Sequence, residues 1–180
     1  LNHPISSLDS DQTILLIFGD SSLVWGNTRN DETSTRHPLK KAMSDYTSDD
    51  DLIRLRSFLF QNDKKAYAVD FDCAHGATLA DMADKAVARL AYYKKELGDL
   101  FNLSNFQFLF FWCGNELTNQ DGSLNHPDNV NIGIDHFLAS VQGFPRIALV
   151  GPGTSKLWNM EQAFDDSAEP VLQKIFKAKI

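Results

Sequence analysis

An α/β fold with a parallel sheet is predicted by three features of this 180-residue sequence. Short apolar segments have the composition of buried strands, and amphipathic segments with helical spacing alternate with them. Several of these strands end in a short polar motif that contains glycine. The alternation implies parallel strands with helices on both faces of the sheet, a three-layer α/β/α architecture. Because ligands bind beyond the carboxyl ends of such strands, the polar motifs are the candidate functional residues.

The strands are predicted from apolar runs that are rich in β-branched or aromatic residues. The first run ends at Gly19, and the third, which contains most of a phenylalanine-rich stretch, ends at Gly114 and is expected to be buried on both faces. The fourth precedes Gly151. The four predicted strands cover residues 13–18, 66–69, 106–112 and 146–150.

Helices are predicted where apolar residues recur every three or four positions between these strands. Residues 52–59 follow three aspartates, which suit the positive end of a helix dipole. Thr78, with Asp81 three residues later, has the pattern of a capping box at the start of the next helix. Two further helices are predicted over residues 129–141 and 168–180. We expect the whole chain, residues 1–180, to form one domain.

Composition and charge argue against several classes of function. The hydrophobic content of 43% and charged content of 23% are those of an ordinary globular domain. A net charge of −7 argues against nucleic acid or an anionic membrane as the main partner. No apolar run is long enough to span a bilayer, and residues 1–10 lack the features of a signal peptide. We therefore expect a soluble protein, and the sequence does not indicate its compartment.

Cofactor chemistry has no motif in the sequence. Cys73 and Cys113 are too few for a disulfide framework, so free thiols are expected, and with histidine they are too few for a structural zinc site. The glycine-rich phosphate loops are absent too, which argues against a phosphate-binding α/β domain. We therefore predict no metal and no cofactor.

The polar motifs at the strand ends supply the parts of a nucleophilic site. Ser21 follows the first predicted strand, where a neighbouring base could take its proton. Gly76 follows the second strand and can bring its backbone N–H close to a ligand. Asn115 follows the third, and its amide can donate to developing negative charge, a contact worth about 3 kcal/mol in a transition state. Each motif alone is better explained as a turn, but their combination favours a site.

With these motifs the sequence resembles the SGNH (GDSL-type) serine hydrolase family. The matching blocks are residues 17–26 (IFGDSSLVWG), 69–82 (VDFDCAHGATLADM) and 111–116 (FWCGNE). Their order and spacing fit the family over about residues 13–155. The resemblance implies a flavodoxin-like parallel sheet and hydrolysis of a small carboxylic ester through an acyl-enzyme.

By this resemblance, Ser21 is the nucleophile, and its N–H, the N–H of Gly76 and the amide of Asn115 form the oxyanion hole. The supporting residues are Gly19, Asp20 and Gly114. Ser22 is the neighbour that could be mistaken for the nucleophile, and its ordinary role would be a helix N-cap. Glu116 stands where the family usually has aspartate, at a position that is structural rather than catalytic.

The family's fourth block, an Asp-x-x-His that supplies the base, is not found after the last predicted strand. The resemblance would place it beyond Ile180, which leaves open that the domain is C-terminally incomplete. The candidate bases within the chain are His75 and His126, although His75 is better explained as a turn residue and His126 as a surface residue.

Two functions therefore stay open at this stage. The first is an SGNH-type serine esterase or acyl hydrolase. The second is a catalytically silent domain of the same fold that binds a ligand or serves as a subunit of a protein assembly.

Overall fold

The protein was analysed as a computed structural model, which describes residues 13–20, 67–74, 76–112, 114–119, 121, 123–151 and 161–178. Its strands are β1 (Thr13–Gly19), β2 (Tyr67–Cys73), β3 (Phe106–Phe111) and β4 (Ile147–Val150). Its helices are α4 (Leu79–Leu97), α5 (Pro127–Val141) and α6 (Glu161–Lys177), with short 3₁₀ turns η2 (Gly98–Leu100), η3 (Leu103–Asn105) and η4 (Asn115–Leu117). The predicted α/β class is confirmed.

The described strands form one parallel sheet in the order β2-β1-β3-β4. After β1 the chain passes to one side of that strand, and after β2 it crosses to the other side to form β3. Such a reversal is a topological switch point, and in open α/β sheets ligands bind beyond the carboxyl ends of the strands at that point. The strand order is the flavodoxin-like order that the sequence predicted.

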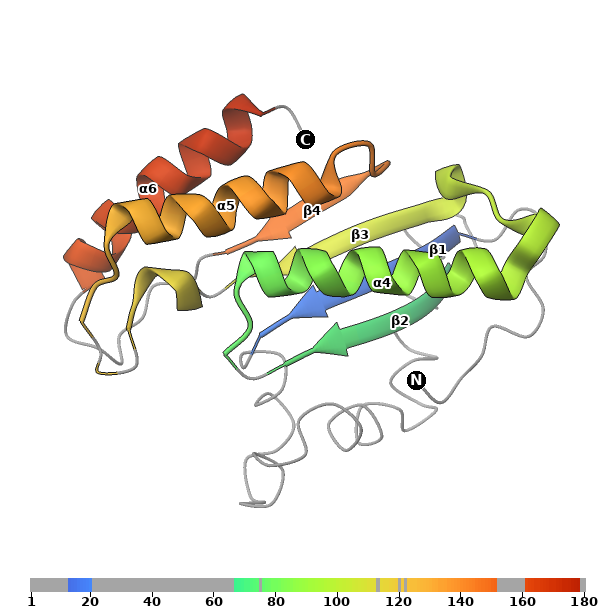
Figure 1. Cartoon of the computed structure of the whole chain (residues 1–180), viewed down its shortest axis with the longest axis horizontal. Coiled ribbons are helices and arrows are strands. Elements are labelled where there is room, and N and C mark those ends of the chain that lie inside the picture. Colours follow the sequence, from blue (N-terminus) through green and yellow to red (C-terminus); the bar gives the residue numbers. More distant parts are fainter. Residues whose placement is uncertain are drawn as a thin grey trace, which may run out of the picture.

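Helices α4 and α5 pack against each other over one face of the sheet, in front of the strands in Figure 1. Helix α6 lies beside α5, and the Lys174 Nζ is 2.6 Å from Asp135 Oδ1 across the two helices. The helix predicted over residues 52–59 lies outside the described residues.

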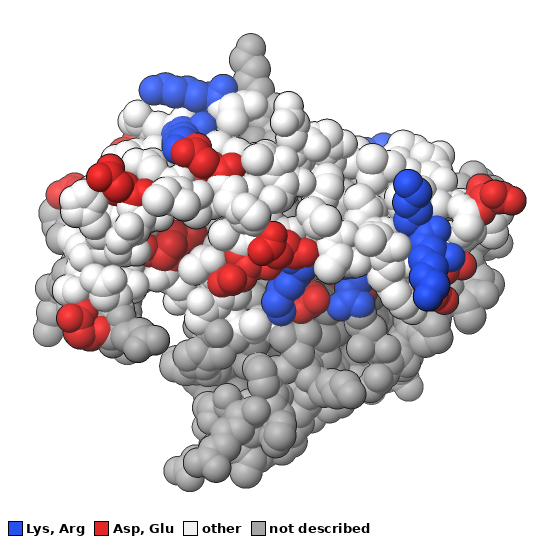
Figure 2. Space-filling view, viewed as in Figure 1, with Lys and Arg blue, Asp and Glu red and all other residues white. Residues whose placement is uncertain are grey.

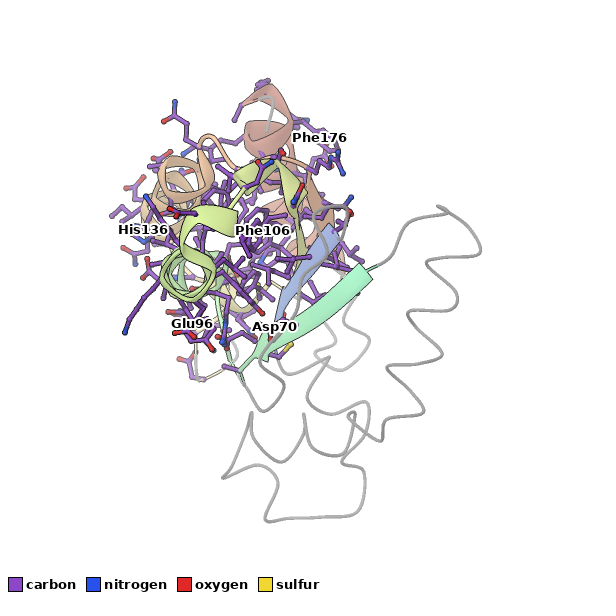
Figure 3. All side chains as sticks on the ribbon, turned by 90° about the vertical axis from the view of Figure 1, so that its right-hand side faces the viewer. Asp70, Glu96, Phe106, His136 and Phe176 are labelled. Atoms are coloured by element: carbon purple, nitrogen blue, oxygen red, sulfur yellow. The ribbon has the colours of Figure 1, made fainter. Side chains whose placement is uncertain are left out.

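The core lies between the sheet and the α4–α5 layer. Alternate residues of β1 and β3 are fully buried there, with Phe18 stacked on Phe110 at a ring separation of 5.5 Å and Phe137 of α5 edge-on to Phe110 at 5.2 Å. Figure 3 shows Phe106 in the same layer. The other face of β3 is only half-buried, so the expectation of a strand buried on both faces is wrong for its alternate residues.

The predicted start of α4 is confirmed. Thr78 is the N-cap, its side chain accepts from the N–H of Asp81, and the Asp81 side chain accepts from the N–H of Thr78 in a complete capping box. The helix ends at Gly98, whose φ of +51° lies in the left-handed region.

Two elements are longer than predicted, for physical reasons. Strand β2 continues through Asp70 and Asp72 to Cys73, because both carboxylates find partners on α4. Helix α6 begins at residue 161 although Pro170 lies inside it. A proline in a helix removes a backbone hydrogen bond, so the sequence favoured a later start.

A charged network joins β2 to α4. Lys85 Nζ lies 2.6 Å from Asp72 Oδ1, and Arg89 Nη2 lies 3.0 Å from Asp72 Oδ2. The hydroxyl of Tyr93 donates to Asp70 Oδ2 at 2.8 Å, while Oδ1 of the same buried carboxylate has no hydrogen-bond partner. Burial raises the pKa of Asp70, and the nearby Arg89 opposes that rise only in part.

The raised pKa of Asp70 predicts how stability depends on pH. The folded state binds the Asp70 proton more tightly than the unfolded state does. The stability that this proton contributes to the folded state is therefore complete below pH 3.8, and it is lost as the pH rises through the pKa of Asp70 in the folded state. Asp70→Asn keeps an acceptor for Tyr93 and should therefore gain stability relative to the wild type between pH 4 and pH 7. Urea unfolding at both pH values measures this, with the exposed Asp99→Asn as control. An equal pH dependence in the wild type and Asp70→Asn would contradict the prediction.

The surface over α4 and α5 carries charges of both signs. Figure 2 shows acidic and basic side chains interspersed on this face among neutral residues. None of the described helices is long and apolar enough to cross a membrane.

Candidate active site at the carboxyl edge of the sheet

The carboxyl ends of β1, β2 and β3 lie side by side at one edge of the sheet. Gly19 at the end of β1 is in register with Cys73 on one side and Phe111 on the other. The N–H of Ala74 donates to the Gly19 carbonyl at 3.0 Å. In Figure 1 the turn after β2 and the η4 turn lie at this same end of the strands. The structure therefore brings together the strand ends that carry the predicted motifs.

Gly76 forms the turn between β2 and α4. Its φ is +72°, in the left-handed region that favours glycine, and a Cβ there would meet nothing within 4 Å. Glycine is thus required by the backbone conformation and not by close packing. The residue is exposed, and the turn is closed by a bond from the Ala77 N–H to the Ala74 carbonyl at 3.2 Å.

Asn115 begins η4, directly after Gly114, which has a φ of +85°. Its Nδ2 donates to the carbonyl of Ala77 at 2.8 Å, across 38 residues of sequence. The primary amide has two N–H groups, and this bond uses one of them. The Asn115 amide is thus bonded to the residue that follows Gly76.

Glu116 is buried beneath this turn and makes two charge-assisted hydrogen bonds. Its Oε1 accepts from the backbone N–H of Leu79 at 3.0 Å, and its Oε2 accepts from Trp112 Nε1 at 2.5 Å. Burial raises the pKa of Glu116, and the hydrogen bonds from Trp112 and Leu79 oppose that rise. The sequence marked this position only as a departure from the family pattern and gave no sign of its partners.

Asp20 and Cys73 lie beneath the same edge. Asp20 is completely buried, and its charge contributes to raising the pKa of both Glu116 and Cys73. The Cys73 thiol is free and buried, and burial together with the charge of Asp72 raises its pKa to about 12. Such a thiol is almost entirely protonated at neutral pH, so Cys73 is not a competing nucleophile. Cys113 lies outside the described residues.

The two described histidines have surface roles. His126 is the N-cap of α5, and its exposed ring accepts from the N–H of Asp128 at 3.3 Å through Nδ1. His136 Nε2 is 2.7 Å from Asp84 Oδ1, which ties α5 to α4 on their outer side (Figure 3). Ser21, Ser22 and His75 lie outside the described residues, so the nucleophile and the first candidate base stay predictions.

Within the described ranges, no group of three or more histidine, cysteine, aspartate or glutamate side chains is arranged to hold a metal ion.

No protein-family model matches the sequence, and no curated protein does. Among solved structures, the fold resembles the crystal structure of AlinE4, described as an SGNH-hydrolase family esterase, with 16% identity and a TM-score of 0.47 over 93% of this chain and 74% of that one. Two mutants of the same esterase give 17% and 16% identity with TM-scores of 0.48 and 0.47, over the same shares of each chain. Similarity this distant supports no residue role.

Proposed function

We propose that the protein is a serine ester hydrolase of the SGNH type that acts on a small carboxylic ester. The observation that supports this proposal is the bond from the Asn115 amide to the carbonyl of Ala77, the residue after Gly76, near the carboxyl ends of β2 and β3. Ser21 follows Gly19 and Asp20 at the end of β1, between the strands that end in these two donors.

The reaction follows from these groups. The Ser21 hydroxyl attacks the ester carbonyl and passes its proton to a base, while the oxyanion accepts from the N–H groups of Ser21 and Gly76 and from the Asn115 amide. Collapse of the intermediate expels the alcohol, which takes the proton back from the base. Water then hydrolyses the acyl-serine by the same steps and releases the acid. The base is a histidine; of the two candidates in this chain, His126 caps α5 at the surface, which leaves His75.

Turnover of p-nitrophenyl acetate by the full-length protein tests the proposal. We expect hydrolysis above the buffer rate and a stoichiometric mass increase after treatment with a fluorophosphonate, located on the peptide that contains Ser21. A folded protein that neither turns over the ester nor takes up the label would overturn the proposal. Circular dichroism of the same sample establishes that it is folded.

A silent domain of the same fold is the second candidate. Both described imidazoles are engaged elsewhere, His126 at the start of α5 and His136 on Asp84. Losing the histidine of such a triad can cost about a millionfold in turnover. If the second candidate holds, the folded protein binds a short ester or a protein partner without hydrolysis, and fluorophosphonate leaves its mass unchanged.

Substituting Asn115 by alanine should lower kcat by about 10²–10³-fold with little change in KM, because the amide donates mainly to charge that develops in the transition state. Asn119→Ala is the matched control, since its amide bonds Ser123 and the Leu124 carbonyl within the next loop. Steady-state kinetics on both variants measure the effect. Equal kcat values for the two would remove Asn115 from the oxyanion hole.

A further inference from the structure

We propose that Glu116 is the positioning residue of this site, and that its carboxylate holds the Gly76 turn and the Asn115 turn at a fixed separation. This inference rests on the proposed ester hydrolase function. It concerns a residue that touches neither the substrate nor the nucleophile, and that acts through the two proposed oxyanion donors, Gly76 and Asn115.

The Glu116 carboxylate accepts two hydrogen bonds, one from each of two different elements. Oε1 accepts from Leu79, the first residue of α4, only three positions after Gly76. Oε2 accepts from Trp112, which ends the β3 segment just before η4. One side chain thus links the element that presents Gly76 to the element that presents Asn115.

The two residues that donate to Glu116, Trp112 and Leu79, are both held rigidly. Trp112 is 2% exposed, and its backbone N–H donates to the Val150 carbonyl at 2.8 Å, so its backbone is tied to β4 and its indole is enclosed in the core. Leu79 is 0% exposed and belongs to the first turn of a 19-residue helix, whose positive dipole end favours a carboxylate. A carboxylate that is bonded to two fixed donors is itself held in place, and it keeps those two donors at a constant separation.

The backbone around Glu116 is also held by hydrogen bonds. Its carbonyl accepts from Asn125 Nδ2 at 3.1 Å, and the Asn125 N–H donates to the Leu117 carbonyl at 2.8 Å. These bonds tie η4 to the segment that precedes α5. The bond from Asn115 to Ala77 ties the same turn to the residue after Gly76.

Glutamine at position 116 is the sharpest substitution, because it keeps the size of the side chain. Its single oxygen can accept from Leu79 or from Trp112, but its NH₂ group must then face the other donor. The two turns are expected to separate slightly, and a shift of about 1 Å in a catalytic group can cost 10²-fold in rate. Glu96→Gln, an exposed glutamate on α4, is the matched control.

NMR and kinetics together test the inference in the full-length protein. In Glu116→Gln we expect the resonances of the Gly76 N–H, the Asn115 side-chain amide and the Trp112 indole N–H to shift. In Glu96→Gln we expect all three to stay in place. We also expect kcat of Glu116→Gln to fall by about 10–100-fold while KM stays within about threefold. Trp112→Phe, which removes the indole donor together with part of a buried ring, should lower kcat in the same way, with no further loss of kcat in the double variant.

The two proposals fail in different ways. Unshifted Gly76 and Asn115 resonances in Glu116→Gln would overturn the positioning role, whether or not the protein is active. Shifted resonances in a wild type that has no esterase activity would support the positioning role and overturn the proposed function. If the wild type is active, a fall in thermal stability with unchanged kcat would show that Glu116 is only structural.

Discussion

Alanine in place of Ser21 is expected to reduce turnover of a short ester by about a millionfold, to the rate left by the oxyanion donors alone. The physical reason is that the serine oxygen is the only atom that forms the covalent intermediate. In a hydrolase that uses a serine and a histidine as one unit, losing the nucleophile removes nearly the whole catalytic advantage of the pair. KM for any residual reaction should change little, because the hydroxyl contributes little to ground-state binding.

Ser22→Ala is the matched control, because this serine adjoins Ser21 and differs only in its place relative to the end of β1. We expect it to keep turnover within about threefold of the wild type, as for a residue that caps a helix. Steady-state hydrolysis of p-nitrophenyl acetate and fluorophosphonate labelling measure both variants. Loss of activity in Ser22→Ala with retention in Ser21→Ala would move the nucleophile by one residue and break the match to the first motif.

Local patterns in the sequence were enough to predict the fold and the place of the motifs. Apolar runs placed all four described strands, and the Thr78–Asp81 pattern placed the start of α4 to the residue. Periodicity worked here because these elements bury one regular face. The alternation of strands and helices also indicated where the motifs meet, because the carboxyl ends of parallel strands all lie at one edge of the sheet.

Long-range partners could not be predicted. Charged residues such as Asp70 and Asp72 usually indicate that a buried strand has ended. Strand β2 continues through them because side chains of α4 bond both carboxylates. Glu116 likewise has no local signal, because its partners Leu79 and Trp112 are chosen by the tertiary fold. The family resemblance predicted Asn115 as an oxyanion donor but did not predict its bond to Ala77. Pairings of this kind depend on three-dimensional contacts that no spacing in the sequence encodes.

Replacing Gly151 by alanine is expected to destabilise the protein more than any other single methyl addition among the described glycines. A Cβ at this position would lie 1.9 Å from the carbonyl oxygen of Trp112 and 3.0 Å from its carbonyl carbon, and the residue has a φ of +117°. The atoms in the way are backbone, and Trp112 is held to β4 by its N–H. Backbone strain and overpacking together should cost about 3–5 kcal/mol, a large part of the stability of a domain of this size.

The measurement is thermal or urea unfolding beside Gly133→Ala, which adds the same methyl group inside α5. A Cβ at Gly133 would meet nothing within 4 Å, so that variant should gain about 1 kcal/mol from helix propensity. We expect the melting temperatures of the two variants to move in opposite directions, with a fall of about 10 °C for Gly151→Ala. A Gly151→Ala variant as stable as the wild type would show that β4 does not pack on Trp112 in this way. Because the Trp112 indole donates to Glu116, any Gly151→Ala protein that still folds should also lose kcat, which links this packing contact to the oxyanion donors.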